Sequence, residues 1–127
     1  MAVLVIALAA AAIAGLRETQ DRIFALTAAR EAGEAAAEAA TAVIADAYAE
    51  EIGARVARPS REMSVVLGDA STRERARSAA QDMSHRNGGA AVDEVTVTCH
   101  AGPVDVGVSL GGTWFRARFA GPECSPR

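Results

Sequence analysis

A chain of 127 residues has room for one modest domain, and its 50% hydrophobic content includes only 4% aromatic residues. The net charge of −3 and the lack of a basic cluster interleaved with aromatic side chains exclude a nucleic-acid-binding protein. The charge is uneven: residues 1–57 contain four arginines and eight acids, whereas residues 58–127 contain nine arginines and eight acids.

The first part of the chain predicts one nearly continuous helix, which we expect to run from Ala2 to Ala57 and to end before Pro59. Met1 to Leu16 has no charged or strongly polar side chain, and the rest is rich in the good helix formers Ala, Glu and Arg. About 55 residues at 1.5 Å per residue make a rod of roughly 80 Å. A rod with one apolar end is suited to insertion into a bilayer or into a bundle of similar helices.

Several interpretations of Met1–Leu16 stay open, among them a buried helix of a soluble protein. Ala12-Ile13-Ala14 before Gly15 fits a signal-peptide cleavage site, although a positive n-region is missing. The segment is slightly short for a membrane span, which takes about 17–25 apolar residues. It also fits the exposed N-terminal segment of a pilin-like subunit, which needs no basic flank once its leader has been removed.

The middle of the rod carries small residues at a spacing of four, namely Ala25, Ala29, Gly33 and Ala37. Such spacing lets helix backbones approach closely, as in pairs of membrane helices, although alanine is also simply a good helix former. Glycine costs about 1 kcal/mol relative to alanine in a helix interior, so three glycines in one helix favour a packing or bending role. These glycines are Gly15, Gly33 and Gly53. Towards the end of the rod, an apolar stripe at i+4 spacing consists of Ile44, Tyr48, Ile52 and Val56.

The segments after the rod predict a small head. Glu62–Leu67 is rich in β-branched residues and is closed by Gly68-Asp69, which predicts a strand. Ser71-Thr72-Arg73-Glu74 fits a capping box with Ser71 as the N-cap of a second helix. Asn87-Gly88-Gly89 supplies a left-handed stop near Arg86, and the thin apolar face of this helix is suited to cover one side of a sheet.

The last third of the chain predicts a three-stranded antiparallel meander. Gly111-Gly112 accepts the positive φ angles of a type I′ turn, which places Leu110 opposite Thr113. Together with a turn at residues 100–103, this register gives the pairs Val108–Phe115, Val106–Ala117, Val104–Phe119, Asp105–Arg118, Cys99–Val104, Val97–Val106 and Val95–Val108. The apolar partners then share one face without any shift of register.

The residues with reactive or metal-binding side chains are few. Cys99 and Cys124 are the only cysteines, and a disulfide between them is expected if the head is exported, with two unpaired thiols as the alternative. His85 and His100 lack any spacing relative to the cysteines that is typical of a metal site. Neither histidine neighbours a nucleophile motif, and no glycine-rich phosphate loop precedes a helix. The sequence therefore predicts no catalytic residue, no metal and no cofactor.

Trp114 is predicted to share a sheet face with Arg116 and Arg118, away from the valine core. A tryptophan exposed between arginines favours a contact surface, although cover by the second helix is an equal alternative. These three residues form the candidate contact surface of the head.

With these elements in place, the chain resembles the small TadE/TadF/TadG-like proteins of the tight-adherence (Flp) pilus system, particularly actinobacterial ones. The resemblance rests on an apolar N-terminal helix that runs into Leu26-Thr27-Ala28-Ala29-Arg30-Glu31-Ala32-Gly33-Glu34-Ala35-Ala36-Ala37, similar to the family's D-A-A-R-E-x-A-R-x-A-A stretch. It continues in Ala76–Ala91, an Ala-rich helix that ends in Asn-Gly and is followed by Val-x-Val strands. It covers most of the chain, with motifs of low specificity.

The resemblance implies a minor pilin-like or assembly-linked component without catalytic activity. Val5 stands where pilin-type subunits usually carry Glu, and no acid precedes Glu18, which departs from the pattern by which a standard pilin docks. The expected partners are other pilus subunits, through the N-terminal helix, and the membrane, with no nucleic acid and no small-molecule substrate. The residues that we expect to serve assembly or packing are Val5, Gly15, Ala29, Gly33 and Ala37.

We therefore expect an α+β protein in which a helix over residues 1–57 carries a small head over residues 58–127, built from one short strand, one helix and the meander. The leading hypothesis is a non-enzymatic structural or assembly component of a type IV (Tad/Flp-like) pilus, held in the inner membrane with an extracytoplasmic head and then in a pilus or at the cell surface. The alternative is a secreted small binding module whose first 14 residues are a cleaved signal peptide. An enzyme has the least support, because so thin a sheet under one small helix offers little room for a pocket.

Overall fold

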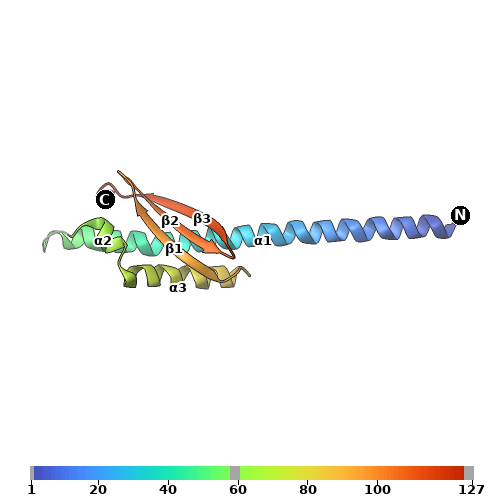
Figure 1. Ribbon diagram of the computed structural model, residues 1–127, viewed down its shortest axis with the longest axis horizontal. Coiled ribbons are helices and arrows are strands. Elements are labelled where there is room, and N and C mark those ends of the chain that lie inside the picture. The colour runs from blue at the N-terminus through green and yellow to red at the C-terminus, as the bar shows by residue number, and fades with distance from the viewer. Residues whose placement is uncertain (1, 58–60, 125–127) are drawn as a thin grey trace.

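The computed structural model describes residues 2–57 and 61–124, with side chains from residue 12 onward. Its elements are helices α1 (Ala2–Ala54), α2 (Met63–Leu67) and α3 (Ala70–Arg86) and strands β1 (Val92–Cys99), β2 (Pro103–Leu110) and β3 (Thr113–Ala120). The sheet crosses the C-terminal half of α1, α3 runs beside that half, and the N-terminal half of α1 projects from the head (Figure 1). This arrangement confirms the predicted α+β class with a long N-terminal helix and a three-stranded antiparallel sheet.

Helix α1 has 53 residues and ends three residues before the predicted Ala57. Its last turn tightens, because the amide of Arg55 is shared between the carbonyls of Glu51 (3.2 Å) and Ile52 (3.4 Å), and the amide of Ala57 bonds to the carbonyl of Ala54 (3.0 Å). Pro59, to which the sequence assigned the stop, lies outside the described residues.

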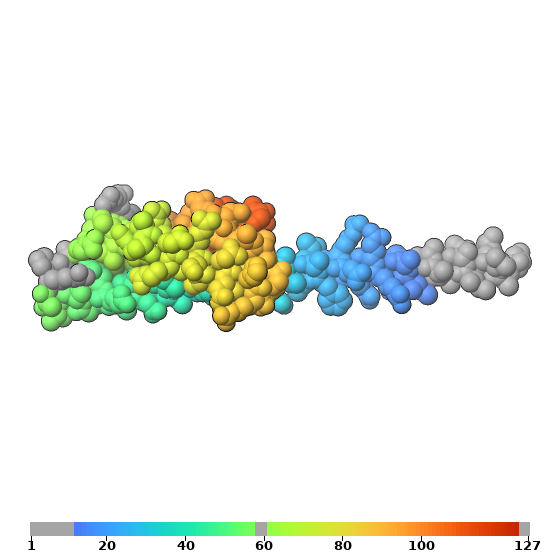
Figure 2. Space-filling model, turned by 90° about the horizontal axis from the view of Figure 1, so that it is seen from below, coloured from blue at the N-terminus to red at the C-terminus, as the bar shows by residue number. Residues whose placement is uncertain are grey.

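The head has two layers, the sheet on one side and the helices α1 and α3 on the other. Alanines dominate the buried faces of the helices, which lets the two backbones run close together. Figure 2 shows α3 lying along α1, while the blue segment of α1 stands clear of the head. The buried residues of this helix contact include Ala32, Ala36, Ala37 and Ala40 of α1 and Ala76, Ala80 and Ser84 of α3. The second helix was expected to cover the sheet, but α1 provides most of that cover and α3 meets the sheet mainly at β1.

The predicted stripe near the end of α1 is correct for three of its four residues. Ile44 is fully buried, and Tyr48 and Ile52 are half-buried against the core. Val56 lies beyond the end of α1 and is 94% exposed, so the tightened last turn removes it from the stripe.

The register of the sheet is the one predicted, including every pair named from the sequence. Gly111 and Gly112 have φ angles of 54° and 78°, as a type I′ turn requires. Strand β1 begins at Val92, earlier than predicted, and the register shifts between Val92 and Glu94. The carboxylate of Asp93 at this bulge accepts a hydrogen bond from the amide of Gly112 (3.0 Å), which ties the start of β1 to the hairpin.

The strand predicted at Glu62–Leu67 is wrong, because this segment forms helix α2. Its hydrogen bonds are local: the amide of Val66 bonds to the carbonyl of Glu62 (3.2 Å) and that of Gly68 to the carbonyl of Ser64 (3.0 Å). A helical turn places Met63 and Leu67 on one face, and both are buried, whereas Val65 is 40% exposed. Burial of the i and i+4 pair therefore outweighs the β preference of the intervening valines.

The predicted start of α3 is also wrong, whereas its end is correct. The N-cap is Asp69 and not Ser71, and its carboxylate accepts a hydrogen bond from the amide of Ser71 (3.0 Å). Hydrogen bonds from the hydroxyl and then the amide of Ser71 lower the pKa of Asp69, and a negative charge is favoured at a helix N-terminus. The helix ends at Arg86, followed by Asn87 and by Gly88 with a φ of 69°.

Candidate interaction surfaces

The projecting half of α1 exposes large apolar side chains. We call Ile13, Leu16, Ile23 and Phe24 the apolar stripe; their exposed fractions lie between 57% and 72%. Gln20 and Thr27 complete the same helix face, and the hydroxyl of Thr27 donates to the carbonyl of Ile23 (2.9 Å), so its methyl group is left to extend the stripe. Leu26, 72% exposed, lies beside it.

The apolar stripe points away from the head. At about 100° per residue, its mean direction is turned by roughly 150° from the face of α1 that carries the buried residues Ala36, Ala40 and Ile44. Those residues pack against the sheet and α3. The head therefore cannot cover the stripe unless it gives up its packing against these core residues.

The other side of the projecting segment is charged. There Arg22 pairs with Glu18 (2.7 Å) at i and i+4. A second i and i+4 pair, Arg30 with Glu34 (2.7 Å), lies where α1 enters the head and is in line with the apolar stripe, not opposite it. The hydrogen bond with Glu34, and then its charge, raise the pKa of Arg30. None of the helices that the structure describes has a stretch long and apolar enough to cross a bilayer.

The small residues predicted for assembly or packing fall into two groups. Gly33 and Ala37 are buried in the head, and a Cβ built on Gly33 would lie 2.3 Å from the ring of Phe115. Gly15 and Ala29 are exposed, and no atom lies within 4 Å of a Cβ built on Gly15. The side chain of Val5 lies outside the described residues. Packing within the head thus accounts for Gly33 and Ala37, and a role in assembly stays a prediction for the others.

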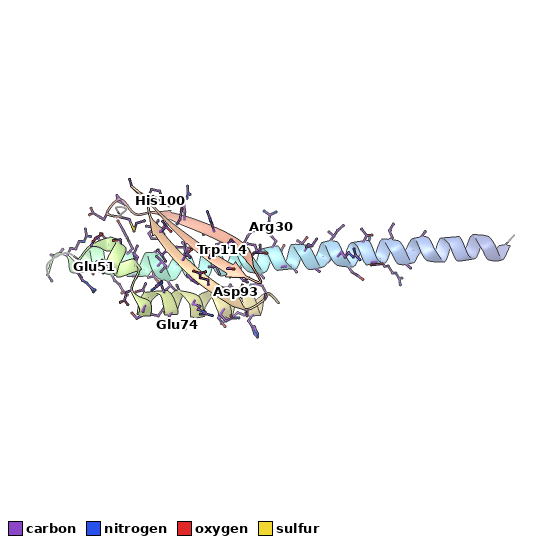
Figure 3. All side chains as sticks on the ribbon, in the orientation of Figure 1. Arg30, Glu51, Glu74, Asp93, His100 and Trp114 are labelled. Carbon is purple, nitrogen blue, oxygen red and sulfur yellow. A yellow bond between two sulfur atoms is a disulfide. The ribbon has the colours of Figure 1, made fainter. Side chains whose placement is uncertain are left out.

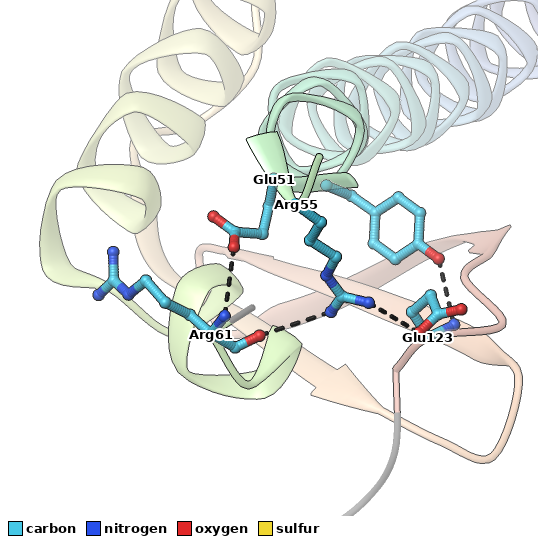
Figure 4. A network of polar contacts seen from close by, with 5 residues as sticks. Glu51, Arg55, Arg61 and Glu123 are labelled. Atoms are coloured by element: carbon cyan, nitrogen blue, oxygen red, sulfur yellow. Dashed lines mark hydrogen bonds and ion pairs between the residues drawn. The ribbon is translucent and has the colours of Figure 1, made fainter. Parts of the chain in front are cut away.

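A polar network at the end of α1 was not predicted from the sequence. Figure 4 shows Arg55 reaching the carboxylate of Glu123 (2.8 Å) and the carbonyl of Arg61 (3.4 Å), while the amide of Arg61 donates to Glu51 (3.4 Å). The amide of Glu123 donates to the hydroxyl of Tyr48 (3.2 Å). The sequence feature that could have indicated this network is Glu51, an acidic residue at a position in phase with the buried face of the helix. The network ties the end of the rod to the C-terminal segment of the head.

The predicted disulfide between Cys99 and Cys124 is present, with a Cα–Cα distance of 5.2 Å. Cys124 is fully buried, and the amide of Gly121 bonds to the carbonyl of Gly102 (2.6 Å) on the way to it. The bridge therefore fixes the segment after β3 against the end of β1.

The predicted contact surface lies on the outer face of the sheet, the face turned away from the helices. Trp114 is 44% exposed there and is labelled with His100 in Figure 3. Arg118 is already paired on the head: its guanidinium forms two hydrogen bonds with Asp105 (2.7 and 3.2 Å). The carboxylate of Asp105 also lies 3.0 Å from Nε2 of His100. The hydrogen bond from Arg118 is the main cause that lowers the pKa of Asp105. Arg116 forms no ion pair or hydrogen bond within residues 2–57 and 61–124.

The described part of the chain contains no group of three or more histidine, cysteine or acidic side chains arranged to hold a metal ion. Comparison of the chain with protein-family models, with curated proteins and with solved structures finds no match in any of the three. The surfaces themselves are therefore the basis for an assignment of function.

Proposed function

We propose that the protein is a non-enzymatic structural or assembly component of a filament of the type IV (Tad/Flp-like) pilus kind, which it joins through its N-terminal helix. The observation that carries this proposal is the apolar stripe of α1, which is exposed and turned away from the head. An exposed contiguous apolar surface on a rigid element is typical of an interaction site.

The chemistry of the stripe favours helices of other subunits as its partners. Gln20 lies within it, Arg17 and Asp21 flank it, and such side chains are costly in a hydrocarbon layer. A bundle of helices accommodates them, since polar side chains at the flanks stay in contact with water. The uncharged residues 1–16, which include the first two residues of the stripe, are suited to the membrane before assembly and to the bundle after it.

The head supports an extracytoplasmic location. A disulfide is typical of oxidising compartments, and here it closes a segment of a small domain that has a thin core. The proposed route is therefore from the inner membrane, with the head outside the cytoplasm, to a pilus or the cell surface.

The test uses the purified full-length chain, transferred from detergent to buffer and followed by sedimentation velocity. We expect large assemblies for the unmodified chain and monomers for the double variant Ile23→Gln with Phe24→Gln. The matched control is Val56→Gln with Val65→Gln, which removes two exposed valines away from the stripe and should leave assembly unchanged. An Ile23→Gln, Phe24→Gln variant that assembles like the unmodified chain would refute the proposal.

The alternative, a secreted module without its first 14 residues, predicts a mature N-terminus at Gly15. Three residues of the apolar stripe, Leu16, Ile23 and Phe24, would remain in that product and would still be exposed. Intact mass of the protein from its native cells separates the two: the secreted module is supported by a mass that starts at Gly15, and the filament component by one that retains residues 1–14.

A further inference from the structure

The outer face of the sheet carries a feature that assembly through α1 does not use. Trp114, the only tryptophan of the chain, lies across Gly107 of the neighbouring strand: a Cβ built on Gly107 would lie 3.3 Å from Cζ3 of Trp114 and 2.6 Å from Oγ1 of Thr96. Because residue 107 has no side chain, the indole ring can lie directly on the backbone of the sheet at this point. One edge of the ring packs on the strand, and 44% of the residue is left open to solvent.

Beside the indole lies a shallow hollow of about 360 Å³. Gly107 forms its floor, and the side chains that line it are Thr96, Thr98, His100, Asp105, Trp114 and Arg116. They come from all three strands and from the turn after β1, so the sheet register holds them in place. The hollow therefore combines one aromatic plane with hydroxyl, imidazole and guanidinium donors.

The charge of the hollow favours an anion. Arg118 donates to both carboxylate oxygens of Asp105, and His100 also contacts Oδ2, so the charge of this carboxylate is already paired with cationic or donor groups. Arg116 has no acidic partner within the described residues, and its guanidinium is the open charge of the hollow. A planar guanidinium binds a carboxylate through two parallel hydrogen bonds.

The shape and polarity favour a sugar over a peptide. A peptide anchor side chain needs an apolar pocket, and here the apolar lining is a single flat ring. A pyranose has an apolar face that stacks on an indole, and hydroxyl groups around its rim that pair with threonine and histidine side chains. Adding a carboxylate to that ring supplies the group that Arg116 lacks.

We propose that the outer sheet face is a binding site for acidic polysaccharide, in which a uronic acid unit stacks on Trp114 and pairs its carboxylate with Arg116. The neighbouring hydroxyls of Thr96 and Thr98 bind the sugar hydroxyls. Arg118 acts as a positioning residue, because its pair with Asp105 keeps that carboxylate away from the ligand. This site is independent of the filament proposal, since a monomer with a changed apolar stripe carries the same sheet face.

The single tryptophan makes the site directly measurable. Titration of the full chain with a hexamer of galacturonic acid should change the emission of Trp114 in a saturable way, and calorimetry should give the same dissociation constant. Arg116→Gln should weaken binding at least about tenfold, as for the loss of a charged hydrogen-bonded pair. Trp114→Ala, followed by calorimetry, should abolish measurable binding. Arg75→Gln on α3 removes an exposed arginine from another face and serves as the matched control, with unchanged binding.

Two comparison ligands define the specificity. A neutral glucose hexamer should bind at least about tenfold more weakly than the acidic hexamer, because Arg116 then has no partner. Hexaglutamate with an amidated C-terminus carries the same number of carboxylates without a sugar ring and should leave the tryptophan emission unchanged. The proposal is overturned if the acidic hexamer gives no saturable response, if Arg116→Gln binds as well as the unmodified chain, or if hexaglutamate competes equally well.

Discussion

Gly33 offers the sharpest test of how the rod is joined to the head. Replacement of glycine by alanine in a helix interior gains about 1 kcal/mol of stability from helix propensity alone. At residue 33 the new Cβ would lie 2.3 Å from Cε2 and Cζ of Phe115, about 1 Å closer than a normal contact. Moving the ring or separating the sheet from α1 costs roughly 1–3 kcal/mol, as for other overpacked sites. We expect Gly33→Ala to destabilise the head by about 1 kcal/mol.

Gly53→Ala is the matched control, because nothing lies within 4 Å of a Cβ built there. It should stabilise the protein by up to about 1 kcal/mol, somewhat less than in mid-helix because residue 53 is in the last turn. Urea denaturation, followed by tryptophan emission and circular dichroism, measures both, and Phe115→Leu in the Gly33→Ala background should recover part of the loss. If Gly33→Ala stabilises the chain as much as Gly53→Ala does, then α1 and β3 do not approach at residue 33 and the packing argument fails.

Three further predictions concern the head. Replacement of both Cys99 and Cys124 by alanine opens a loop of 25 residues and should cost about 3 kcal/mol of stability in the chain-entropy model, measured as a lower melting temperature of the head. Two alkylatable thiols in the exported protein would contradict the presence of the bridge. Leu67→Ala should cost about 2–5 kcal/mol in denaturant unfolding, whereas Val65→Ala should change stability by less than about 0.5 kcal/mol. Equal effects of the two substitutions would contradict helix α2 and favour the strand predicted for this segment. The pKa of Asp105 is lowered in the folded state, so its contribution to stability is present above the unfolded pKa of about 4 and is lost as the pH falls through the folded pKa. The melting temperature of Asp105→Asn should therefore fall less steeply than that of the unmodified chain below about pH 4. Parallel pH dependences of the two melting temperatures would exclude a stabilising Asp105–Arg118 pair.

The parts of the fold that were predicted correctly are those that local chemistry decides. Alternation of Val and polar residues sets the faces of the strands, and Gly111-Gly112 sets the register, so the pairs from Val95 to Phe119 follow without tertiary information. The disulfide follows from this register as well, because it leaves Cys99 at the sheet end near which the chain returns with Cys124.

The parts that were missed depend on tertiary contacts. The five residues of α2 are too few to distinguish the 3.6-residue period of a helix from the two-residue period of a strand. Burial of Met63 and Leu67 against the rest of the head favours the helix. The bulge at Asp93 depends on a hydrogen bond to Gly112, which lies far along the chain. For the candidate sites, the sequence indicated the outward direction of Trp114, but it gave no means to see that Asp105 occupies Arg118 and leaves Arg116 open.

The positions of the proposed sites allow both to act in one subunit. The apolar stripe is turned roughly 150° away from the face of α1 that holds the head, so burying it against other helices leaves the head on the outside of a bundle. The sheet in turn lies between α1 and the hollow beside Trp114, so that hollow faces away from the rod (Figures 1 and 3). A variant that loses assembly through Ile23 and Phe24 should therefore bind the acidic hexamer with unchanged affinity as a monomer. Conversely, Arg116→Gln should assemble normally, because no atom of the apolar stripe depends on the outer face of the sheet.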